Sequence, residues 1–168
     1  MIPYIIMILS FLLDGLLTNY LPYLEGTLTL FTPQLTLISI FMIYPFFKKQ
    51  EKKYYIIAFI LGFLYDLFYT NLLFFNGLLF LGIACFTRWI YKNYEINSIR
   101  LLLYLSLIIV LYESLTGIIL YIFQLVPITF MRVFYKITHS LLLNILYGEM
   151  LYFLLKWLPK KYKKTRLN

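Results

Sequence analysis

The chain has 168 residues, a formal net charge of +8 and a hydrophobic content of 62%, whereas soluble domains contain roughly 45–50% apolar residues. This composition excludes an ordinary soluble domain, and it differs from that of disordered or nucleic-acid-binding proteins, which are rich in charged residues. With one Cys and one His, the chain lacks the residues for an internal disulfide or for a zinc site of four Cys/His ligands. The cysteine, Cys85, lies in the apolar run LFLGIACF, where we expect a buried small apolar residue.

Apolar runs, separated by Pro, Gly and charged residues, predict an all-α polytopic membrane protein. We expect a single integral membrane domain, residues 1–168, folded as a bundle of six transmembrane helices. The expected spans are residues 3–20, 28–47, 54–74, 78–91, 101–125 and 134–158. Pro33 should lie within the first turns of the second helix or kink it. The fourth segment has only about 14 residues, so it either crosses the bilayer or re-enters it.

The basic residues predict the orientation of the bundle. With six crossings and a cytoplasmic N-terminus, only Arg132 and Lys136 of the 15 Lys and Arg residues lie outside. Cytoplasmic loops carry the Lys/Arg excess, so this distribution predicts a cell-membrane protein with both termini in the cytoplasm. The basic tail, residues 159–168, suits the anionic headgroups of membrane lipids, although a simple stop-transfer anchor explains it as well.

Four carboxylates lie within the expected spans: Asp14, Asp66, Glu113 and Glu149. The segments FLLDGLLTN and FLYDLFYTN repeat at an offset of 52 residues, and LYESLTG is a weaker third copy. Asp14, Asp66 and Glu113 lie on expected helices that run in the same direction, so we expect them at similar depths in the membrane. Asn19 and Asn71 should lie closer to the outer surface than the aspartates of the same repeats. These six residues are candidates for contact with a partner or ligand, or for packing of neighbouring helices.

The sequence contains no motif of a catalytic nucleophile, a phosphate-binding loop or a metal-binding helix. We therefore predict no catalytic residue, no metal, no cofactor and no enzymatic activity. Gly62, Gly82 and Gly117 are candidates for close packing of helices, because small residues allow two backbones to approach.

The segments LDGLLTNYLP, FTPQLTLISIF, GFLYDLFYTNLLFFNGLLFL and LYESLTG together resemble the bacterial rod shape-determining protein family MreD. The resemblance implies a non-catalytic scaffold or regulator in the rod-shape elongation complex, supporting cell shape and side-wall peptidoglycan synthesis. It implies MreC, MreB, RodA and a class B penicillin-binding protein as partners, and no nucleic acid. The residues that match the family pattern are Asp14, Gly62, Tyr65, Asp66 and Gly77, for which it implies structural or partner-contact roles.

The alternative is a substrate-binding subunit of an energy-coupling-factor vitamin transporter, which is a six-helix membrane bundle of similar length. Such subunits usually carry an Ala-x-x-x-Ala surface on the first helix. This chain has only Ala58 and Ala84, so the sequence argues against the alternative, although the two families are expected to have similar folds. A vitamin retained by the purified protein would favour the transporter.

Overall fold

The computed structural model describes residues 2–24, 32–70, 72–124 and 130–157. Within these ranges the chain forms six α-helices, which confirms the all-helical fold: α1 (Ile2–Leu24), α2 (Leu35–Phe47), α3 (Glu51–Tyr69), α4 (Phe75–Asn93), α5 (Ser98–Ile122) and α6 (Phe130–Trp157). Asn71 and the tail at 159–168 lie outside the described residues.

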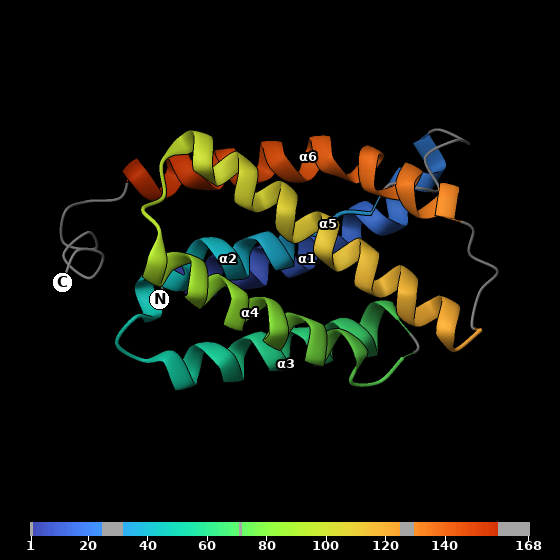
Figure 1. Ribbon diagram of the computed structural model, residues 1–168, viewed down its shortest axis with the longest axis horizontal. Helices are drawn as coiled ribbons and strands as arrows, with labels where there is room; N and C mark the ends of the chain where they lie inside the picture. Colours follow the sequence, from blue (N-terminus) through green and yellow to red (C-terminus); the bar gives the residue numbers. More distant parts are fainter. Residues whose placement is uncertain (1, 25–31, 71, 125–129, 158–168) are drawn as a thin grey trace.

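The helices lie side by side and run alternately in opposite directions (Figure 1). Ile2 and Trp157 therefore lie at the same end of the bundle, together with the connection between α2 and α3. We call this end the basic end, because most of the Lys and Arg residues belong to it. The opposite end, where α1, α3 and α5 finish, is called the acidic end.

Helix α2 occupies the centre of the bundle (Figure 1). It packs against α1, α3, α4 and α6, and every one of its residues except Phe46 is buried. A helix that is apolar on all sides is stable only inside a protein or a membrane, and here the neighbouring helices surround it. The 13 residues of α2 extend only about 20 Å, less than the roughly 30 Å of a bilayer core.

Three helical segments are long and apolar enough to cross a membrane by themselves: Ile2–Asn19, Ser98–Ile122 and Val133–Trp157. They are compatible with membrane insertion. Crossing by the other three helices of the described chain stays a prediction.

The structure corrects the expected span 28–47, because residues 32–34 are not helical and α2 begins only at Leu35. Pro33 therefore precedes α2 and neither lies within it nor kinks it. A proline there leaves α2 intact, and the residue before a proline avoids the helical region. Residues 28–31 lie outside the described chain.

Helix α4 is longer than the expected fourth segment, 78–91, because it has 19 residues. Whether this segment crosses the membrane stays a prediction. Helix α4 begins at Phe75 and ends at Asn93. Lys92 is therefore part of its last turn, since a charged residue can belong to the end of a helix. Conversely, α3 ends at Tyr69 and α5 at Ile122, earlier than expected from the apolar runs at 54–74 and 101–125. Phe74 then has a left-handed backbone conformation, with φ of 67°, which separates α3 from α4.

The three glycines predicted to allow close packing have different surroundings. A Cβ atom at Gly62 on α3 would overlap the carbonyl oxygen of Asn76 on α4, and one at Gly117 would lie 3.0 Å from a methyl group of Val133 on α6. At Gly82, by contrast, no atom from a neighbouring helix of the described chain lies within 4 Å of the Cβ position. Within the described chain, Gly62 and Gly117 therefore face neighbouring helices and Gly82 faces outward.

We predict that Gly62→Ala destabilises the protein by about 1–3 kcal/mol, because the added methyl group meets main-chain atoms that cannot move aside. The matched control is Gly82→Ala, whose methyl group has free space and whose higher helix propensity adds up to about 1 kcal/mol of stability. Thermal unfolding of both variants in detergent checks this. Equal unfolding temperatures would contradict the close α3–α4 packing.

Candidate functional site

The three acids expected at similar depths lie in the second half of their helices, the half nearer the acidic end: Asp14 on α1, Asp66 on α3 and Glu113 on α5. Asp14 and Asp66 have no exposed side-chain surface, and Glu113 is 1% exposed. Because a buried carboxylate is costly without hydrogen-bond donors or a cation, the partners of these groups define the candidate site.

Asp14 on α1 binds the first turn of α2. Its Oδ1 accepts a hydrogen bond from the Leu35 N–H at 2.7 Å, and its Oδ2 accepts one from the Thr36 N–H at 2.8 Å and another from the Thr36 hydroxyl. The first N–H groups of a helix have no partner within the helix, and the helix dipole favours a negative charge there. Asp14 therefore caps α2 from a neighbouring helix.

Asp66 on α3 does the same for α4. The Asn76 N–H donates to Asp66 Oδ2 at 2.8 Å, the Gly77 N–H donates to the same oxygen at 3.3 Å, and the Asn76 amide donates to Oδ1 at 2.7 Å. Asn76 in turn accepts a hydrogen bond of 2.7 Å from the Tyr112 hydroxyl on α5. The Asp66 site thus connects α3, α4 and α5.

This geometry explains the sequence repeat. In each copy an aspartate in the second half of one helix accepts N–H groups from the start of the next helix, so α1–α2 and α3–α4 are two hairpins with the same kind of cap. The threonines of the repeat differ in role: Thr70 donates to the Asp66 carboxylate at 2.8 Å, whereas Thr18 donates to the main-chain oxygen of Asp14 at 2.7 Å.

Glu113 on α5 has a different environment, because one of its partners is a cation. Its Oε2 lies 3.0 Å from the Lys136 ammonium on α6, and its Oε1 accepts hydrogen bonds from the Thr32 hydroxyl and the Gln34 amide. Lys136 is one of the two basic residues expected on the outer side, and the structure pairs it with Glu113. Neither Asp14 nor Asp66 has an ion pair among the described residues.

The non-helical residues before α2 are held by α6. Asn144 Oδ1 accepts the Gln34 N–H at 2.8 Å, and its amide donates to the Thr32 carbonyl at 3.0 Å. The Ser140 hydroxyl accepts the Thr32 N–H at 3.2 Å. These bonds satisfy main-chain groups that have no helical partner, which is necessary in a site away from water.

The remaining candidates lie apart from these contacts. Asn19 is exposed, and Glu149 is half-buried on α6, with an Oε1 atom that has no hydrogen-bond partner in the described part of the chain. Asn71 lies outside the described residues. Contact of any of the six polar candidates with a partner or ligand stays a prediction.

Several residues of the site were not singled out from the sequence: Gln34, Thr36, Asn76 and Tyr112. Thr36 and Asn76 are polar residues in the first turns of helices, after Pro33 and Phe74, and this position was the available signal. No three His, Cys, Asp or Glu side chains within the described ranges are grouped to hold a metal ion. What the arrangement provides chemically is charge-assisted hydrogen bonding that fixes helix ends.

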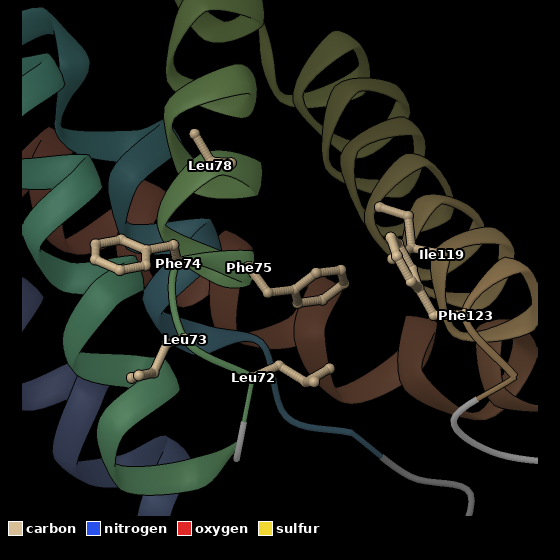
Figure 2. A pocket seen from close by; sticks show the side chains of 7 residues that line it. All are labelled: Leu72, Leu73, Phe74, Phe75, Leu78, Ile119 and Phe123. Carbon is tan, nitrogen blue, oxygen red and sulfur yellow. The ribbon is translucent and has the colours of Figure 1, made fainter.

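An apolar hollow of about 490 Å³ lies at the same end, between the start of α4 and the end of α5. Figure 2 shows Phe75 pointing toward Ile119 and Phe123 across the gap between the two helices. The other lining residues are Leu72, Leu73, Phe74 and Leu78. The hollow faces outward, since Leu78 and Phe123 are both more than half exposed.

Comparison with known protein families matches residues 1–162 to the family described as rod shape-determining protein MreD. No curated protein and no solved structure matches the chain. The expected similarity to substrate-binding subunits of energy-coupling-factor transporters is therefore not supported, and neither is the vitamin-transport alternative.

We predict that Asp66→Asn and Asp14→Asn each lower the free energy of unfolding by about 1–3 kcal/mol, because an amide NH2 group would face main-chain donors and leave one unpaired. Thr18→Val is the control at similar depth, since it removes only a bond to an oxygen of its own helix. Thermal unfolding in detergent distinguishes them. The capping role fails if the Asn variants are as stable as Thr18→Val.

We also predict that Lys136→Met costs about 3–5 kcal/mol, because it leaves a buried charge without a cation. Adding Glu113→Gln to Lys136→Met should restore part of the lost stability, which a double-mutant cycle of unfolding free energies measures. Strictly additive losses would show that the pair contributes no coupling.

Proposed function

This chain belongs to the MreD family of rod shape-determining proteins, bacterial membrane proteins of the MreBCD shape system, and we propose that it acts there as a non-catalytic membrane scaffold. In this proposal its helices bind the membrane span of MreC and, through that complex, support MreB, RodA and a class B penicillin-binding protein. The result is control of cell shape and of side-wall peptidoglycan synthesis.

The observation that carries the proposal is the inward placement of polar groups and the outward placement of apolar ones. Asp14, Asp66 and Glu113 are buried and bind groups of their own chain. The exposed surfaces of the helices, in contrast, carry large apolar side chains, such as Ile8 on α1 and Leu142 on α6. In a membrane these apolar surfaces are available to lipid or to other spans.

One exposed helix face has the shape that suits a partner helix. Leu78, Gly82, Cys85 and Trp89 are exposed on α4 at spacings of four, three and four residues, the pattern of a helix–helix seam. The two small residues lie between two large ones, and none of the other described helices comes within 4 Å of the Cβ position of Gly82. Small residues let membrane helices approach closely, so we propose that the MreC span packs along this α4 face.

The apolar hollow extends the α4 face toward the acidic end, because Leu78 belongs to both. A large apolar side chain of the MreC span would fill the hollow and contact Phe75 and Phe123. Gly62 and Gly117 are less suitable for a partner, since their space is occupied by Asn76 and Val133 of the same chain.

The native cysteine provides the test, because Cys85 is the only cysteine of the chain and is exposed in the middle of the α4 face. We predict that it forms a disulfide with a cysteine placed in the MreC span, at MreC positions that repeat every three or four residues. Oxidative crosslinking in membranes, followed by non-reducing electrophoresis, measures the yield.

The control moves the cysteine to another exposed helix face at similar depth, with Cys85→Ser combined with Leu142→Cys on α6, where Leu142 is 72% exposed. This variant should crosslink several-fold less. A second arm, Gly82→Leu, should reduce the Cys85 crosslink and convert rod-shaped cells to rounded ones. Equal yields at both cysteine positions would contradict a specific α4 interface.

A further inference from the structure

The connection between α2 and α3 and the first turn of α3, at the basic end, carry four exposed lysines within six residues. These are Lys48, Lys49, Lys52 and Lys53, which we call the lysine surface. With Gln50 and Glu51 they line a hollow of about 510 Å³. The four lysines thus lie together around one concave part of the protein.

The charge of the lysine surface is not neutralised by the described part of the chain. The only acid within it, Glu51, is occupied by Arg88 of α4, whose Nη2 lies 2.9 Å from Glu51 Oε2 and whose Nε donates to Glu51 Oε1 at 3.0 Å. None of the four lysines has an ion pair among the described residues. The surface therefore presents four uncompensated positive charges.

The backbone that carries these lysines is held firmly by buried neighbours. The Gln50 N–H donates to the Phe47 carbonyl at 2.7 Å, and the Tyr54 hydroxyl donates to the Ile40 carbonyl at 3.1 Å. Phe47 and Tyr54, on either side of the connection, are 4% and 1% exposed. The lysines are consequently attached to an ordered backbone, between the last residue of α2 and the first turn of α3, where a membrane surface is expected.

We propose that the lysine surface binds the headgroups of anionic phospholipids in the leaflet at the basic end. Charge complementarity favours this partner: each lysine presents a compact positive charge, and the phosphodiester of phosphatidylglycerol is negative. The lysine surface flanks the ends of α2 and α3, so a lipid of the surrounding bilayer reaches it without any rearrangement. This binding is separate from the α4 face and does not require MreC.

Native mass spectrometry of the full chain tests the proposal. The protein is reconstituted in nanodiscs containing equal amounts of phosphatidylglycerol and phosphatidylcholine, and the ratio of the two lipids retained after release is measured. The native chain should be enriched in phosphatidylglycerol. Replacement of all four lysines by Gln should lower that enrichment at least threefold, and replacement by Arg should preserve it.

The matched control removes four positive charges elsewhere, by replacing Lys160, Lys161, Lys163 and Lys164 of the C-terminal tail with Gln. It should keep most of the enrichment if the lysine surface binds the lipid. An equal loss in both quadruple variants, or an unchanged ratio in the lysine-surface variant, overturns the proposal. The paired variants Lys48→Gln/Lys49→Gln and Lys52→Gln/Lys53→Gln give intermediate losses if the whole surface contributes, and unchanged unfolding temperatures establish that folding is retained.

Discussion

The interaction on which the rest of the structure depends is a buried carboxylate that accepts main-chain N–H groups from the first turn of the next helix. Asp14 does this for α2, and Asp66 for α4. Away from water, an unsatisfied main-chain group costs several kcal/mol, and a hydrogen bond to a charged group contributes roughly 1.5–3 kcal/mol. Each cap therefore joins two antiparallel helices and allows the second helix to begin inside the bundle.

The central position of α2 follows from this cap. A helix of 13 residues whose start is buried needs donors and acceptors from its neighbours at that point. Asp14 binds the first N–H groups, while Glu113 and Asn144 bind the residues just before them. Helices α1, α5 and α6 are thereby connected to α2 by hydrogen bonds, and Lys136 supplies the cation that Glu113 requires. The polar groups are used internally, which leaves apolar surfaces for contacts in the membrane.

The sequence predicted the helical class, the approximate segments and the family, because hydrophobic runs and their punctuation are local properties. The predictions failed where packing decides the outcome. Pro33 was expected inside a helix, and Cys85, which was expected to be a buried small apolar residue, is exposed. In a membrane protein both the core and the lipid-facing surface are apolar, so hydrophobicity alone does not distinguish them.

By itself, then, the sequence determined the composition of a membrane bundle, the asymmetric distribution of its basic residues and the repeated placement of an aspartate within a helix. Only the tertiary structure decided what those acids bind. Leu35 is 21 residues from Asp14, and Asn144 is 110 residues from Gln34. Contacts over such separations arise from how helices pack, and the same packing encloses Gly62 and leaves Gly82 open.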